Sequence, residues 1–229
     1  MATLPPNFTL LQVVPELDAG GGEQSALDIN AAVVAAGGRS LVAARGGRMV
    51  ERLRAAGGEF ILLPVHTKNP LLALKNAFAL AGTVRREKVS ILHVRSRAPA
   101  FSVRLASKLT GVPWVATYHG AYPAKGALKR WYNSVMTRGA LVIANSEFTR
   151  AHLLAQHEVD PKRVVTIPRG VDLKRFDPAA VDLRRLAAMK AWLGVDNGDA
   201  RVKVLLAGRL TRLKGQLVLV EAIDRKSTR

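Results

Sequence analysis

Two cations near the end of the sequence stand in a loop of a kind that holds anions. Arg209 and Lys214 lie between Gly208 and Gly215, directly after the apolar run 202–207. The run is typical of a buried strand, and a helical pattern follows the second glycine. Backbone N–H groups and the helix dipole favour an anion at such a turn, and two cations suit a diphosphate. An ordinary strand–turn–helix connection with solvated cations is the alternative.

Glycines, arginines and a histidine stand after three other apolar runs. The glycines 20–22 would let a bound group come close to the backbone. Arg95 and Arg97 follow a later run and suit a phosphate or a carboxylate. His119 precedes a glycine, and there it can hydrogen-bond a substrate hydroxyl or share a proton. A flexible glycine loop, solvated arginines and a structural histidine remain the alternatives.

Several other chemistries are disfavoured. The glycine loop lacks the G-x-G-x-x-G spacing, and the second expected strand ends at Ala44-Arg45 without the acidic residue that would hold a ribose, which argues against a dehydrogenase. No His/Asp/Glu cluster has metal-ligand spacing, and no nucleophile-elbow or Walker-type loop occurs. The sequence has no cysteine, which excludes disulfides and thiolate metal sites and fits a reducing compartment.

The charge is strongly positive and unevenly distributed. The 229 residues carry a formal charge of +18, from 35 Lys+Arg against 17 Asp+Glu. Between Lys88 and Ser146 there are nine Lys/Arg and no acidic residue. Such a block favours an anionic partner: a phosphorylated substrate, an anionic membrane or nucleic acid. A coding bias toward arginine would give the same excess without a function.

The basic segment 125–138 is expected to form an amphipathic helix that carries Trp131. It either packs its apolar stripe on a sheet or lies on an anionic membrane. Aromatic residues are only 5% of the sequence and do not alternate with the basic block, so we expect no nucleic-acid partner. No secretory signal is visible in the sequence, and no apolar stretch reaches the roughly 18 residues of a membrane-spanning helix.

The elements that must position these residues alternate along the chain. Short apolar strands separated by helices and glycines predict an α/β fold with a doubly wound parallel sheet, whose ligands bind at the carboxyl ends of the strands. We expect strands at 10–14, 40–44, 59–63, 91–94, 113–117, 141–144 and 164–167, and helices at 24–36, 48–56, 70–87, 99–109, 128–138, 146–156 and 183–193.

The pattern changes after the seventh strand. Prolines and aspartates between 168 and 180 indicate the exit from a first domain, which we place at 1–175. The segment 176–229 would hold a linker helix and then the first strand, at 202–207, and first helix of a second α/β domain. One strand and one helix cannot bury a sheet, so we expect the sequence to be a fragment of a longer protein.

Five motifs in order resemble the glycosyltransferases of family 4, retaining enzymes of the GT-B fold with two Rossmann-like domains. The match extends over nearly the whole chain. Its motifs are Gly20–Glu23, Tyr118-His119-Gly120, Val142–Thr149, Ile167–Asp172 with Arg175-Phe176, and Gly208–Gly215. Within the family, 93–102 and 119–122 look like alphaproteobacterial envelope-sugar transferases, including lipopolysaccharide core mannosyltransferases.

The resemblance implies roles for the residues of three of these motifs. Residues 1–175 would be the acceptor-side domain, and the second domain would bind the nucleotide-sugar. Arg209 and Lys214 would contact the donor diphosphate and stabilise charge on the leaving group. His119 would sit near the transferred sugar, while Gly21 and Gly22 approach the donor phosphate. The family's two glutamates, seven residues apart in the second domain, are absent, so we expect this chain to be inactive alone.

The resemblance also implies partners. The donor would be a UDP- or GDP-linked sugar, the acceptor an envelope glycan or a lipid-linked glycan, and no metal or other cofactor would be needed. Arg95 and Arg97 remain candidates for the acceptor or another anion. We expect a cytoplasmic protein, with association at the inner face of the cytoplasmic membrane as an open question. The competing hypothesis is a non-enzymatic basic α/β module that binds an anionic membrane or nucleic acid.

Overall fold

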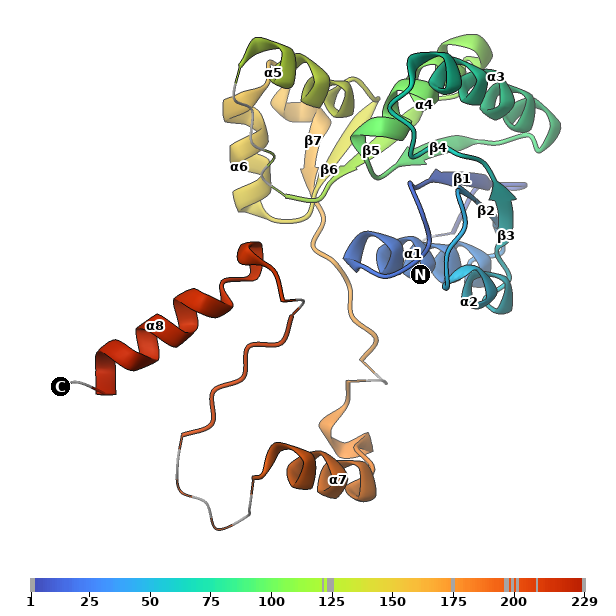
Figure 1. Ribbon diagram of the computed structural model, residues 1–229. Coiled ribbons are helices and arrows are strands. Elements are labelled where there is room, and N and C mark those ends of the chain that lie inside the picture. The colour runs from blue at the N-terminus through green and yellow to red at the C-terminus, as the bar shows by residue number, and fades with distance from the viewer. Residues whose placement is uncertain are drawn as a thin grey trace. The chain divides into compact units, whose positions relative to one another are not determined.

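The computed structural model describes residues 3–120, 122, 126–173, 176–195, 198, 200, 202–208 and 210–227. Contacts between Cα atoms divide the chain into two units, Met1–Val171 and Asp172–Arg229. The division falls close to the domain boundary expected at residue 175. The first unit contains all seven strands of the sheet (Figure 1).

Seven parallel strands form one sheet in the order β3-β2-β1-β4-β5-β6-β7. The strands are β1 Thr9–Val13, β2 Arg39–Ala44, β3 Glu59–Leu62, β4 Ile91–Val94, β5 Trp114–Tyr118, β6 Leu141–Ala144 and β7 Val164–Thr166. The chain order reverses between β1 and β4, which pair with Leu10 beside Ile91. Ligands of open α/β sheets bind at such a switch point. The prediction of a parallel α/β sheet is confirmed.

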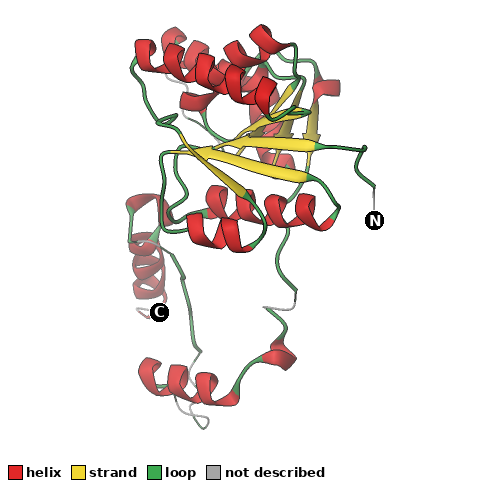
Figure 2. Cartoon of the chain, turned by 90° about the vertical axis from the view of Figure 1, so that its right-hand side faces the viewer, coloured by secondary structure: helices red, strands yellow, loops and turns green. Residues whose placement is uncertain are grey.

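Helices cover both faces of the sheet (Figure 2). One apolar cluster joins the sheet to the first two helices, and a larger cluster joins it to the later ones. Because both faces are covered, the strands β1 and β2 are buried at nearly every position rather than at alternate ones. The helices of this unit are α1 Gly21–Ala35, α2 Val50–Ala55, α3 Pro70–Arg86, α4 Arg97–Thr110, α5 Ala127–Ser134 and α6 Glu147–Gln156, with short 3₁₀ turns η1 Val135–Thr137 and η2 Pro161–Arg163.

Local signals set several of these helix ends. Asn69 caps α3 by accepting from the N–H groups of Leu71 and Leu72, and Pro70 takes the first helical position. Ser146 caps α6 as expected, because its Oγ accepts from the N–H of Thr149 at 3.1 Å. Within the described residues, none of the helices has the length and apolarity needed to span a bilayer.

The second unit contains helices but lacks the predicted strand. Residues 202–207 are described and form no strand, and Val202 and Leu205 are 89% and 81% exposed. A strand needs a neighbour to accept its backbone hydrogen bonds, and the described part of this unit supplies none. The helices present are α7 Leu183–Leu193 and α8 Gln216–Ser227, with 3₁₀ turns η3 Pro178–Ala180 and η4 Arg212–Lys214.

Candidate functional site

A cavity of about 320 Å³ opens at the carboxyl edge of the sheet in the first unit. Four of its lining residues directly follow consecutive strands: Arg95 after β4, His119 after β5, Asn145 after β6 and Ile167 after β7. The strands end in register, with Tyr118 beside Ala144 and Ala144 beside Thr166. Parallel pairing therefore brings residues far apart in the sequence to one edge, as predicted for ligand binding in this fold.

His119 is held from two sides. Its Nδ1 lies 3.0 Å from Nη2 of Arg169, and its backbone carbonyl accepts from Nδ2 of Asn145 at 3.3 Å. Its Nε2 is buried and has no hydrogen-bond partner among the described residues. Burial lowers the pKa of His119 to about 4, with help from the positive charges of Arg95 and Arg169. The imidazole is therefore neutral near pH 7.

The contact with Arg169 fixes the tautomer of this imidazole. A guanidinium carries only donors, so Nδ1 of His119 must accept the hydrogen bond with its lone pair. The single proton of the neutral ring then lies on Nε2, the atom without a described partner. His119 thus offers an N–H donor, and not a free base, to a group beside Nε2.

Arg95 lines the same cavity but is locked into the fold. It is 5% exposed, and its Nε donates to Oε1 of Gln12 at 3.2 Å. The amide of Gln12 in turn donates to the carbonyl of Ala26 in α1 at 2.9 Å. Burial, with the charge of Arg169 as the second cause, lowers the pKa of Arg95 to about 10. Arg95 therefore ties β4 to β1 and α1 and contributes a positive charge behind His119.

The predicted glycine loop is the first turn of α1. Gly21 and Gly22 are helical, and the cap residue Gly20 has no side chain that could cap the helix. A Cβ on Gly21 would overlap the guanidinium of Arg169, and a Cβ on Gly22 would lie 3.7 Å from Nε2 of His119. The lack of a side chain at Gly21 therefore allows Arg169 to lie close against α1.

Arg97 is not in this cavity, although the sequence groups it with Arg95. It begins α4, donates from Nη1 to Oδ1 of Asn133 at 2.8 Å, and stacks its guanidinium 4.2 Å from the ring centre of Tyr122. These contacts occupy the side chain in joining α4 to α5. The structure thus separates the two predicted anion-binding arginines.

The predicted diphosphate loop belongs to the second unit. Lys214 ends η4 and is exposed, and a Cβ on Gly208 would lie 3.6 Å from its Cγ. Gly208 and Lys214 are therefore close together. Arg209 lies outside the described residues. Gly215 ends the turn with a φ of 73°, a conformation that favours glycine.

Three cavity residues were missed by the sequence reasoning. Arg169 lies in the motif Ile167–Asp172 but received no role, and Asn145 and Asp28 were not considered. The position of Arg169 and Asn145 just after predicted strands was the available signal, whereas Asp28 on the second turn of α1 gave none. Among the described residues, no group of three His, Cys, Asp or Glu side chains is arranged to hold a metal ion.

Two solved structures resemble the chain. A glycosyltransferase from Rickettsia africae is 35% identical, with a TM-score of 0.84, and the match covers 98% of this chain and 59% of that one. HepE of Anabaena, solved in complex with UDP-glucose, is 19% identical with a TM-score of 0.73 over 96% of this chain and 58% of its own, which shows a shared fold.

Curated relatives show a similar match over shorter segments. A UDP-Gal:alpha-D-GlcNAc-diphosphoundecaprenol alpha-1,3-galactosyltransferase of Escherichia coli is 28% identical over 65% of this chain and 39% of its own. A D-inositol 3-phosphate glycosyltransferase of Pseudarthrobacter chlorophenolicus is 34% identical over 51% of this chain and 29% of its own. The matched segments thus span well under half of each relative.

The family assignment rests on the match between this chain and a family model. The model of the family described as Glycosyltransferase Family 4 matches residues 19–175, which is more than half of the chain. The matched range contains His119, Arg95, Arg169 and both glycines of the first turn of α1. The chain belongs to glycosyltransferase family 4.

Proposed function

We propose that this chain is part of an enzyme that transfers a sugar from a nucleotide-sugar donor. The observation that carries the proposal is the His119–Arg169 pair at the carboxyl edge of the sheet, with a buried N–H donor facing α1. The family membership supports the reaction class. The UDP-glucose complex of Anabaena HepE, which shares the fold, supports a nucleotide-sugar as the donor.

In this proposal His119 positions the sugar and does not abstract a proton. Its Nε2–H would donate to a hydroxyl of the transferred sugar or to an oxygen of the donor phosphate. The low pKa of about 4 keeps the ring neutral, so protonation does not interfere near pH 7. Glycine at position 22 places no side chain beside Nε2, where a Cβ would lie 3.7 Å away.

The cations would stabilise the negative charge that grows on the leaving nucleotide. Arg169 and Arg95 supply positive charge at the cavity, and we assign Arg209 and Lys214 of the second unit to the donor diphosphate. The bond between the sugar C1 and the donor phosphate breaks as the acceptor oxygen bonds to C1, and the departing phosphate oxygen takes the proton of the acceptor hydroxyl, so that no enzymic base is needed. We propose that transfer proceeds with retention and without a metal ion.

The acceptor in this proposal is an envelope glycan or a glycolipid, as in lipopolysaccharide synthesis. The diphosphoundecaprenol-linked substrate named for the Escherichia coli relative supports a lipid-linked acceptor. We place the reaction on the cytoplasmic side of the membrane. The absence of cysteine is consistent with that reducing compartment.

The test is an assay of the product of the complete reading frame against UDP- and GDP-linked hexoses, with an envelope glycolipid extract as the acceptor. Release of UDP or GDP that requires the extract and persists in EDTA is the expected result. His119→Gln keeps an N–H donor and should lose roughly tenfold in kcat/KM, while His119→Ala should lose on the order of a hundredfold or more. No turnover of any such donor would overturn the proposed function.

The two substitutions also separate a hydrogen-bond donor from a general base. If His119 acted as a base, glutamine would be as inactive as alanine, and the acidic limb of the pH–rate profile would disappear in both variants. The proposed donor role instead predicts that His119→Gln keeps the shape of the wild-type profile.

A further inference from the structure

Two adjoining hollows lie on the first unit and share no lining residue with the candidate site. The first, here called the apolar slot, is formed by α3, α4 and α5 and has a volume of about 380 Å³. The second, here called the basic hollow, is formed by α4, α5 and the segments that follow α5 and α6, with a volume of about 640 Å³. Trp131 lines both hollows.

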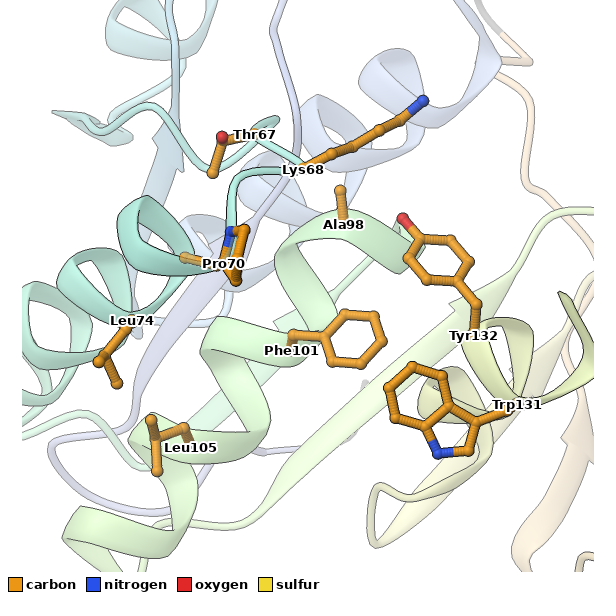
Figure 3. A pocket seen from close by; sticks show the side chains of 10 residues that line it. Thr67, Lys68, Pro70, Leu74, Ala98, Phe101, Leu105, Trp131 and Tyr132 are labelled. Carbon is orange, nitrogen blue, oxygen red and sulfur yellow. The ribbon is translucent and has the colours of Figure 1, made fainter. Parts of the chain in front are cut away.

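The apolar slot crosses the outer surface of α4. Figure 3 shows Leu74 of α3 and Trp131 of α5 on opposite sides of Phe101. Phe101, together with Ala98 and Leu105, forms one stripe of α4 at the helical spacing i, i+3, i+7. Aromatic contacts wall one end, because the ring of Phe101 lies 5.8 Å from that of Trp131 and 5.4 Å from that of Tyr132.

Exposed apolar side chains continue beyond the slot. Leu71, Leu74 and Phe78 on α3 are 77%, 45% and 58% exposed, and they follow one another at helical spacing. Leu128 and Trp131 on α5 are 79% and 57% exposed. Exposed apolar side chains on both helices that wall the slot indicate a binding face.

The basic hollow contains cations without counterions. Arg104, Lys108 and Arg130 line it, and none of them forms an ion pair or side-chain hydrogen bond with a described residue. Arg138 also lines it and makes one long contact, 3.4 Å, with Oγ of Ser134. Glu158 is the one acidic residue among the described lining residues. The hollow is therefore complementary to a phosphate.

Arg163, the remaining arginine among the described lining residues of the hollow, has structural partners. The guanidinium of Arg163 donates to the backbone carbonyls of Thr137 and Gly139. It holds η1 against the segment before β7, and so it orders the wall of the hollow. The unpaired cations are consequently the ones with free donors for a ligand.

We propose that the two hollows together bind an anionic phospholipid, with an acyl chain in the apolar slot and the phosphate in the basic hollow. Their junction carries the argument: Trp131 lies between an apolar lining and a cluster of free cations. Tryptophan prefers this boundary position at a membrane surface. On α4 the cations Arg104 and Lys108 follow the apolar stripe along the adjacent face of the helix.

This ligand is separate from the sugar donor and acceptor of the candidate site. The hollows contain no residue that follows β4 to β7 directly, whereas the candidate site is built from such residues. A free phosphorylated metabolite would leave the slot empty, and an apolar peptide would leave the cations unpaired. The lipid uses both features and would hold the protein at a membrane surface.

The first experiment measures co-sedimentation of the chain with vesicles of equal parts phosphatidylglycerol and phosphatidylcholine, and with vesicles of phosphatidylcholine alone. Binding to the anionic vesicles only is expected. Arg130→Ala should weaken that binding roughly fivefold, since a cation at the surface contributes about 1 kcal/mol. Lys129→Ala is the matched control, because Lys129 is the neighbouring exposed cation on α5 and lines neither hollow.

A second matched pair of variants tests the apolar slot. Trp131→Ala should weaken vesicle binding, whereas Trp192→Ala, which removes an 81% exposed tryptophan of the second unit, should not. Thermal unfolding of each variant shows whether the fold is kept. Equal losses of vesicle binding in Arg130→Ala and Lys129→Ala would show that a diffuse basic surface attracts the vesicles. That result would overturn the proposed lipid site.

A second experiment uses monomeric ligands and excludes a plain anion site. Dihexanoylphosphatidylglycerol below its micelle concentration should bind more tightly than glycerol phosphate and than dihexanoylphosphatidylcholine, as measured by calorimetry. Trp131→Ala should remove the difference between the lipid and glycerol phosphate. Equal binding of the lipid and glycerol phosphate by the wild-type chain would overturn the proposal in favour of a free anion.

Discussion

Nη2 of Arg169 lies 3.0 Å from Nδ1 of His119, so the segment after β7 sets the protonation state of a side chain that follows β5. The contact requires a neutral imidazole, because a protonated Nδ1 would face a donor of like charge. It directs the remaining N–H toward α1, where glycine occupies position 22. The two segments and the helix therefore form one unit of the candidate site.

Replacing Arg169 should raise the pKa of His119 and lower activity. Arg169→Gln removes one of the charges that hold this pKa at about 4, and burial and Arg95 remain. Histidine NMR titration should show a pKa between about 4 and the ordinary 6.5. In the complete enzyme, loss of the fixed tautomer should lower kcat on the order of tenfold to a hundredfold. An unchanged His119 titration would contradict the assigned contact.

Alanine substitutions at the two glycines of the first turn of α1 should impair donor binding or catalysis, whereas the same substitution at Gly82 should not. Gly22→Ala places a methyl group 3.7 Å from Nε2 of His119, and it should weaken donor binding while the fold is kept. Gly21→Ala should displace the flexible Arg169 guanidinium and lower kcat. Gly82→Ala in α3 meets no atom within 4 Å, and it should raise stability by about 0.5–1 kcal/mol without a change in activity. Donor titration measures the binding affinity, and urea unfolding measures the stability.

Arg95 and Arg97 should have separable effects. Arg95→Met removes the buried donor from Oε1 of Gln12 and should cost about 2 kcal/mol, which lowers Tm by about 4–8 °C. It should also reduce kcat/KM, because Arg95 lines the cavity. Arg97→Met loses its contacts with Asn133 and Tyr122 but should leave kcat/KM unchanged. An equal loss of activity in both variants would show that Arg97 also serves the site.

Stability should fall as the pH drops below neutrality. Burial lowers the pKa of His93 well below 6.5 and that of His119 to about 4, and it also lowers the pKa of His157. The unfolded chain therefore binds protons first as the pH falls through about 6.5, and unfolding becomes easier. The contribution of His119 is complete above about pH 6.5 and is lost progressively down to about pH 4.

Urea unfolding at a series of pH values measures this dependence. His119→Gln should reduce the slope of unfolding free energy against pH in the same window, because glutamine does not titrate. A variant with the wild-type slope would show that the imidazole of His119 titrates normally in the folded chain.

The sheet is predictable from the sequence because its strands are short apolar runs between glycines, prolines and polar residues. The predicted bounds of β4 and β6 agree with the structure. Helix starts are less predictable. We expected α4 to begin at Pro99, but it begins at Arg97, because proline is also tolerated within the first helical turn, where its missing N–H has no intrahelical partner.

The candidate site is predictable in position but not in its contacts. Residues that follow parallel strands must share an edge, so His119 and Arg95 could be placed together. Which of two arginines two positions apart enters the cavity depends on where the helix begins, and Arg97 falls on α4. The contact between Arg169 and His119 joins two segments distant in the sequence and has no local signature. The prediction of a strand at 202–207 is wrong, because an apolar run forms a strand only beside a neighbour, and the described part of the second unit supplies none.

The pairing of β1 with β4 at the centre of the sheet governs when the candidate site can assemble. The hydrogen bond from Arg95 to Gln12 spans 83 positions of the chain, and the cavity is completed only by Gly170. During synthesis β1, β2 and β3 can associate early, but the central seam must wait for β4, and contacts of this sequence separation form slowly. We therefore expect the cavity to form only after β4 to β7 have joined β1, so that a chain folded only as far as β3 has no such cavity.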